Sequence, residues 1–172
     1  AVIRAIQAQM PWKLCEEDAR AVVKFFQEKG VKVIAVTKRS PQIRESVHAQ
    51  LMDNGIDLTQ SAMIADDAVL ELDGAVYYKG VLYAQSDKGS SLKSLLQKAN
   101  WNWQDRLIYF VDDRKSHLED YEKSFRSEIK MRAFEYTYSH SQYVDEAILS
   151  LQLQDFLSGN PIQEDSAYLQ PK

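Results

Sequence analysis

The stretch Leu107-Ile-Tyr-Phe-Val-Asp-Asp113 gives the strongest indication of how this chain folds. Its first five residues are apolar, with β-branched and aromatic members, which is typical of a buried strand. Two adjacent carboxylates follow at the point where that strand leaves the core. A second stretch, Val31-Lys-Val-Ile-Ala-Val36, has the same form and is followed by the hydroxyl of Thr37. Since ligands of open α/β sheets bind outside the carboxyl ends of the strands, both stretches predict polar groups at a ligand-binding edge.

Strands and helices are predicted to alternate along the chain. Apolar residues at helical spacing predict helices at 16–29, 40–53, 90–99, 115–125 and 140–157. Short apolar runs predict strands at 31–36, 62–65, 107–111 and 130–136, and turn signals predict three small strands at 69–72, 75–78 and 81–84. This order predicts an α/β fold: a Rossmann-like, mostly parallel sheet with helices on both faces, plus a small β-hairpin insertion. We expect residues 1–157 to form this domain and residues 158–172 to form a C-terminal tail.

Composition narrows the classes of function. The chain has 172 residues and a formal net charge of −4, with Lys and Arg dispersed among acidic residues. This distribution argues against a nucleic-acid partner. No apolar stretch approaches the ~20 residues that span a bilayer, so no membrane partner is expected. Cys15 is the only cysteine, which excludes an intrachain disulfide and a multi-cysteine metal site. No signal peptide is visible, and the compartment and oligomeric state stay open.

Thr37 and Lys88 are candidates for binding an anion. The Thr37 hydroxyl lies near the start of the next predicted helix, although a bond to its own backbone is the common alternative. Lys88 precedes a helix whose dipole prefers anions, and this mismatch suggests an external anion close to Lys88. Gly89 would then let a ligand approach the backbone. The alternative for Lys88 is a solvated surface position.

Asp112 and Asp113 are candidate metal ligands. Adjacent carboxylates repel each other unless a cation or hydrogen-bond donors compensate, and Mg²⁺ is typically held by one or two carboxylates with water and phosphate. In the alternative, one Asp caps the following helix and the other is solvated. A second acidic pair, Asp66-Asp67, is expected to lie in a solvated loop.

Thr37, Lys88 and Asp112-Asp113, in this order, resemble the second, third and fourth motifs of haloacid-dehalogenase-like (HAD-like) phosphatases. Locally, Val33-Ile-Ala-Val-Thr-Lys-Arg-Ser40 and Ile108-Tyr-Phe-Val-Asp-Asp113 are similar to a bacterial branch of that superfamily with no assigned substrate. The resemblance implies a phosphohydrolase that uses Mg²⁺ and an aspartyl-phosphate to hydrolyse a small phosphorylated substrate. Thr37 would bind the phosphoryl oxygens, Lys88 would neutralise phosphate and nucleophile, and Asp112 and Asp113 would hold Mg²⁺. Lys38 would add positive potential for phosphate, unless it is simply solvated.

The chain departs from this family at its first motif, an Asp-x-Asp that supplies the nucleophile. Residues 1–36 contain one Asp, Asp18, and it lies in a helical pattern. We therefore expect the nucleophile to come from a segment upstream of residue 1, and residues 1–172 alone to be inactive. The missing strand is central in the family's sheet, so its neighbours would keep unpaired edges. The alternative is a catalytically inactive HAD-like domain that serves as a binding or interaction module.

Two further possibilities are disfavoured by residue order and spacing. Receiver domains of response regulators also combine acidic residues, a hydroxyl and a lysine, but the acidic pair comes first in them and last here. The three histidines, His48, His117 and His140, show no zinc-ligand spacing. We favour a surface position for His48, a position outside the site for His117, and the start of the last helix for His140.

Overall fold

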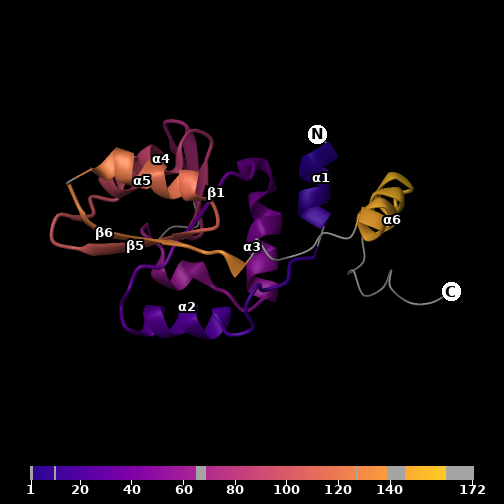
Figure 1. The fold of residues 1–172 in the computed structure, drawn as a ribbon, viewed down its shortest axis with the longest axis horizontal. Coiled ribbons are helices and arrows are strands. Elements are labelled where there is room, and N and C mark those ends of the chain that lie inside the picture. Colours follow the sequence, from indigo (N-terminus) through magenta and orange to yellow (C-terminus); the bar gives the residue numbers. More distant parts are fainter. Residues whose placement is uncertain (1, 10, 65–68, 127, 139–145, 162–172) are drawn as a thin grey trace.

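A computed structural model describes residues 2–9, 11–64, 69–126, 128–138 and 146–161 of this chain. It has the α/β, Rossmann-like architecture predicted from the sequence (Figure 1). The helices are α1 (Val2–Gln9), α2 (Ala19–Glu28), α3 (Arg44–Asp53), α4 (Lys88–Lys98), α5 (Lys115–Phe125) and α6 (Glu146–Leu157). The strands are β1 (Ala35–Thr37), β2 (Leu70–Leu72), β3 (Ala75–Tyr78), β4 (Val81–Ala84), β5 (Leu107–Asp112) and β6 (Lys130–Glu135). No helix in these residues is long and apolar enough to cross a membrane.

The first sheet has four strands in the order β1-β4-β3-β2. β1 and β4 are parallel, with Thr37 beside Tyr83, while β2, β3 and β4 form an antiparallel meander. The region predicted as a separate hairpin insertion is therefore part of this sheet, because its last strand, β4, pairs directly with β1. As a result, the four-stranded sheet is mixed rather than mostly parallel.

The second sheet consists of the parallel pair β5 and β6. Among the described residues, β1 pairs only with β4 and β5 only with β6, so β1 and β5 each keep one edge without a strand partner. α4 and α5 pack together on one side of the β5–β6 pair, and α2 lies on the other side in Figure 1. One core joins both sheets beneath α4 and α5. Its buried residues are Ala75, Tyr77, Leu82, Leu92, Leu95, Leu96, Phe110, Leu118, Tyr121, Phe125 and Ile129.

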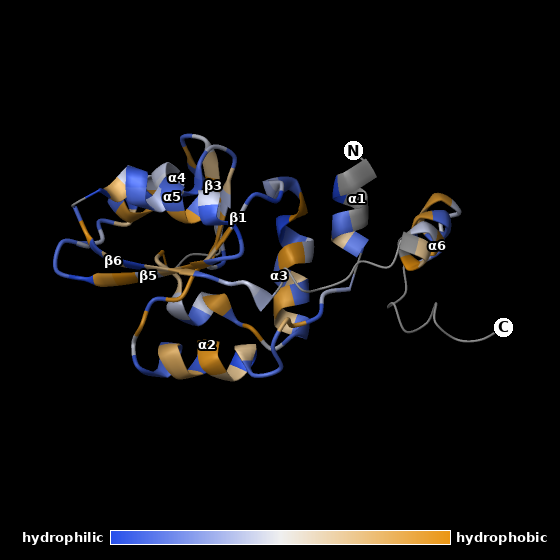
Figure 2. Cartoon of the chain, viewed as in Figure 1, coloured by the Kyte–Doolittle hydropathy of each residue, from blue (hydrophilic) through white to orange (hydrophobic). Residues whose placement is uncertain are grey.

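The opposite face of the β5–β6 pair is exposed and apolar. Side chains alternate along β5, so Phe110 and Asp112 are buried on the α5 side while their neighbours point away. The exposed apolar residues of this face are Leu107, Tyr109, Val111 and Phe134. Exposed apolar residues also occur on α2, at Val22, Phe25 and Phe26. Figure 2 shows the apolar colouring of both regions.

Several element boundaries differ from the prediction. The strand expected at 31–36 is limited to β1, because the backbone N–H of Val31 donates to Phe26 O at the end of α2. Gly30, with φ of 74°, makes this turn possible. Residues 62–64 form no strand. Asp66-Asp67 and His140 lie outside the described residues.

Candidate functional site

The centre of the candidate site is an ion pair between Lys88 and Asp112. Lys88 is the first residue of α4 and Asp112 the last residue of β5. Lys88 Nζ lies 2.5 Å from Asp112 Oδ2, and the two residues are only 7% and 9% exposed. The positive charge of Lys88 at the start of α4 is thus balanced by a carboxylate of the protein itself. The sequence predicted the need for an anion at this position but placed it outside the chain.

The second oxygen of Asp112 is also engaged. Asp112 Oδ1 lies 2.9 Å from His117 Nδ1 and accepts the backbone N–H of Arg114 at 3.1 Å. Burial alone would raise the pKa of Asp112, but the hydrogen bonds from Lys88 and His117 outweigh it, so the pKa lies below its ordinary value. Asp112 is therefore held as a carboxylate. His117 belongs to the site, contrary to expectation, because the first turn of α5 folds it back over the end of β5.

Asp113 differs sharply from Asp112. It follows the end of β5 and is exposed. Three of the roughly four lone-pair positions of Asp112 are occupied, so a cation shared by the two residues would rest mainly on Asp113 and water. No group of three or more His, Cys, Asp or Glu residues suited to a metal occurs in the described ranges. The donor set fits a weakly held, water-rich Mg²⁺, the kind that needs a phosphate to complete it.

Thr37 lies at the carboxyl end of β1 and is half-buried. Its Oγ1 accepts the backbone N–H of Arg39 at 3.1 Å, which is the local bond considered as the alternative. Among the residues that the structure describes, no acceptor takes the hydroxyl proton of Thr37. Lys38 is exposed beside it. Within the described part of the chain no hydrogen bond or ion pair joins Thr37 to Lys88 or Asp112, so the structure places Thr37 at the sheet edge without bringing it into contact with the pair.

Gly89 has a different role from the one expected. A Cβ at this position would lie 2.3 Å from Asp120 O and 2.5 Å from Ser124 Oγ. The glycine therefore permits the close packing of α4 against α5, and the backbone that approaches it belongs to α5 rather than to a ligand. Asp87 strengthens the same junction, because its Oδ1 accepts the backbone N–H of Ser90 at 2.7 Å and the Ser124 hydroxyl at 3.3 Å. This packing fixes the position from which Lys88 reaches Asp112.

Comparison with known proteins assigns a family but no activity. The chain belongs to a family described as a protein of unknown function, DUF2608, whose model matches residues 1–159. No curated protein and no solved structure matches the chain.

Proposed function

We propose that the full-length form of this DUF2608 protein is a Mg²⁺-dependent phosphohydrolase that acts on a small phosphorylated substrate. The observation that supports this best is the buried pair formed by Lys88, the first residue of α4, and Asp112, at the carboxyl end of β5. A lysine fixed in this way is a preorganised positive charge, which is what the transfer of a phosphoryl group requires from a protein.

Each residue has one task in this proposal. Lys88 presents its charge to the phosphoryl oxygens, and the Thr37 hydroxyl donates a hydrogen bond to one of them while its oxygen accepts from Arg39. Lys38 adds positive potential from the solvent side. Asp113, with the remaining lone pair of Asp112, holds Mg²⁺ together with water and phosphate oxygens. Bound Mg²⁺ supplies neutralisation of the charge on the transferring group.

The nucleophile in this proposal is a carboxylate on a strand between β1 and β5. In the described ranges both strands keep an unpaired edge, and a parallel strand that paired with both would end beside Thr37 and Asp112. Its carboxylate attacks phosphorus while the bond to the leaving oxygen breaks. Water then hydrolyses the aspartyl-phosphate, releasing phosphate and the free carboxylate. Asp112 is a poor substitute, because Lys88 and His117 occupy its oxygens.

A phosphatase assay on the full-length protein, with and without Mg²⁺, tests the proposal. Turnover of a phosphomonoester panel should require Mg²⁺ and fall by about 100-fold or more in Lys88→Ala, because a single preorganised charge contributes about this much. Lys98→Ala, at the exposed end of the same helix, is the matched control and should retain full activity. Residues 1–172 alone should show no turnover. If residues 1–172 turn over substrate in the presence of Mg²⁺, and Asp112→Asn abolishes this turnover, then the nucleophile lies within residues 1–172 and the assignment proposed above is wrong.

A second candidate function is phosphate-ligand binding without chemistry. It is favoured by the occupied oxygens of Asp112, since a lysine and a histidine fill positions that a catalytic metal would use. In that case the full-length protein stays inert across the phosphoester panel. Calorimetry with the same compounds would still detect binding that is weakened in Lys88→Ala.

A further inference from the structure

A second cluster of polar groups lies on the α3 side of the sheet, next to Thr37. Tyr83 is the neighbour of Thr37 across the parallel β1–β4 pair. Its side chain is 0% exposed, and its hydroxyl has no hydrogen-bond partner among the described residues. A buried hydroxyl without a partner has lost its hydrogen bonds to water and gained none in return, so this group calls for an explanation. Burial raises the pKa of Tyr83 above its ordinary range, so the hydroxyl keeps its proton and is a donor.

Arg44 brings a second unsatisfied donor to this cluster. Its Nε is buried and has no hydrogen-bond partner in the described part of the chain, while its Nη1 donates to Pro41 O at 3.3 Å. Glu45 Oε1 lies 3.8 Å from Arg44 Nε, too far for a hydrogen bond. Glu45 Oε2 instead accepts the hydroxyl of Tyr78 at 2.9 Å. The one nearby carboxylate therefore leaves Arg44 incompletely paired.

Arg39 supplies a third donor group. It is half-buried, and its guanidinium carbon lies 4.4 Å from the centre of the Trp12 ring. It forms no ion pair with a carboxylate within the described ranges. Burial lowers the pKa of Arg39 from its ordinary value, as expected for a cation that has lost water without gaining an anion. Two cations, Arg44 and Arg39, act on the Tyr83 hydroxyl through their charge and favour its ionised form, while Glu45 and Tyr78 act in the opposite sense.

We propose that Arg39, Arg44 and the Tyr83 hydroxyl bind an anionic oxygen group, a phosphate or a carboxylate. All three offer donors, arginine suits planar or tetrahedral oxyanions, and no acceptor of the described protein residues satisfies the Tyr83 hydroxyl or Arg44 Nε. An anion that accepts from these donors would remove the cost of burying them.

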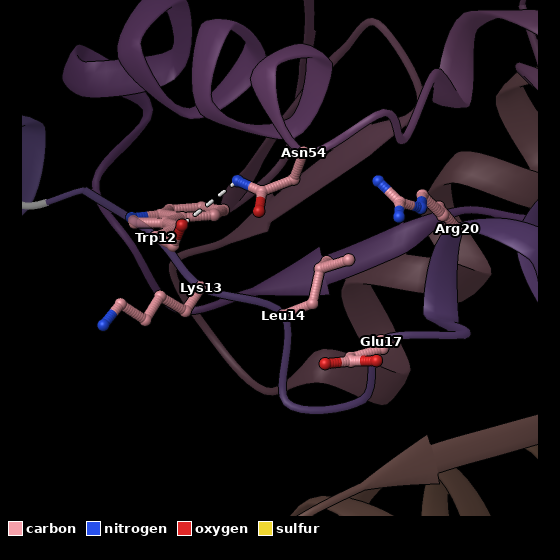
Figure 3. Close-up of a pocket in the computed structure, with 6 residues that line it drawn as sticks. All are labelled: Trp12, Lys13, Leu14, Glu17, Arg20 and Asn54. Carbon is pink, nitrogen blue, oxygen red and sulfur yellow. Dashed lines mark hydrogen bonds between the residues drawn. The ribbon is translucent and has the colours of Figure 1, made fainter.

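Trp12 lies beside Arg39, at one side of this cluster. The Trp12 residue that stacks on Arg39 also lines an open pocket of about 480 Å³, shown in Figure 3. Trp12 lies in a segment without helix or strand, and Asn54 Nδ2 donates to its carbonyl oxygen at 3.3 Å. Since the Tyr83 hydroxyl is shielded from solvent, binding needs a side-chain movement at this cluster, a change of the kind common at binding sites.

This cluster also indicates a class of substrate, and this inference rests on the proposed function. Tyr83 and Thr37 are backbone neighbours across the β1–β4 pair, and in this proposal one ligand spans both. A phosphorylated substrate would place its reacting phosphoryl group at Thr37 and Lys88. A second anionic group of the same molecule would bind at Arg39, Arg44 and Tyr83.

The test compares Tyr83→Phe with Tyr77→Phe by thermal unfolding of residues 1–172, without Mg²⁺ and with EDTA present. The probes are inorganic phosphate and succinate, against chloride at equal ionic strength. Tyr77 is an equally buried tyrosine, but its hydroxyl accepts the backbone N–H of Met63 at 2.9 Å. In chloride, Tyr83→Phe should unfold at the wild-type temperature or above it, whereas Tyr77→Phe should unfold lower. Phosphate, succinate or both should stabilise wild type and Tyr77→Phe, with about tenfold or more weaker affinity in Tyr83→Phe.

A second measurement locates the anion. The ¹⁵N signal of Arg44 Nε should shift on titration in wild type and in Thr37→Ala, and the exposed Arg106 should not shift. A response to phosphate alone or to succinate alone identifies which group the cluster prefers. Equal anion stabilisation of wild type and Tyr83→Phe, or a response lost in Thr37→Ala but kept in Tyr83→Phe, would overturn the proposal. Since no Mg²⁺ is present and turnover is not measured, failure of the phosphohydrolase proposal leaves this result unchanged.

Discussion

The two faces of β5 are built from one apolar run and meet opposite surroundings. Phe110 is 6% exposed and stacks on Tyr121 with ring centres 4.1 Å apart, beneath α4 and α5. The next residue, Val111, is 65% exposed. The buried face also carries Asp112 and its pair with Lys88, so the polar site is anchored on the side that is covered. A run of consecutive apolar residues indicates burial on both faces, and here one face remains open.

This difference shows which contacts hold the residues of the candidate site in place. Lys88 is fixed by the packing of α4 on α5, and Asp112 by its place at the end of the covered strand. Among the described residues, the other face of β5 lacks covering side chains, and β1 and β5 each keep an edge without a strand partner. Substitutions on the covered face and on the open face should therefore differ strongly in their effect on the free energy of unfolding.

The largest decrease in the free energy of unfolding is expected when the aromatic ring of Phe110 on the covered face is removed. Phe110→Ala should lower the free energy of unfolding by about 3–5 kcal/mol, because it removes a buried ring and leaves a cavity against Tyr121. Chemical denaturation of residues 1–172 measures this directly. A change below about 1 kcal/mol would mean that the covered face is as loosely packed as the open one.

A smaller effect is expected from acid, because Asp112 lies on the covered face. Its pKa in the folded protein is lowered from the ordinary 3.8. The stability that it contributes is therefore complete above the unfolded pKa and is lost as pH falls through that value toward the folded pKa. Denaturation between pH 7 and pH 2 should show this loss in wild type.

Asp112→Asn provides the control for the acid prediction. Asp57 and Asp87 also have lowered pKa values, owing to hydrogen bonds with Thr59 and Ser90 that outweigh burial, so part of the acid sensitivity will remain. The variant should be less stable at pH 7 and should lose less stability on acidification. Parallel pH curves for the two proteins would show that Asp112 keeps its ordinary pKa.

Sequence patterns predicted the covered parts of this molecule better than the open ones. α5 occurs where helical spacing placed it, β5 where a short apolar run placed it, and the three strands of the meander where turn signals divided the apolar residues, since these patterns reflect local structure and burial. The sequence predicted that an anion lies close to Lys88 but did not identify it as Asp112, because only the fold brings these two residues together. His117 was missed because its contact depends on the turn at residues 113–114. Tyr83 gave no signal at all, since a tyrosine in an apolar strand looks the same with or without a partner for its hydroxyl.

The smallest expected effect is on the open face, at Val111. Val111→Thr keeps the branched shape and adds a hydroxyl, which is costly only where the side chain is dehydrated. In residues 1–172 the substitution should change the free energy of unfolding by no more than about 0.5 kcal/mol, because the side chain is exposed. In the proposed full-length protein, we expect the added segment to cover this face as well as to pair with the edge of β5, and the same change should then cost more than about 1 kcal/mol. Measuring both forms separates the outcomes: a large cost in residues 1–172 would show that the open face is covered in solution, and an equally small cost in both would show that the added segment leaves this face open.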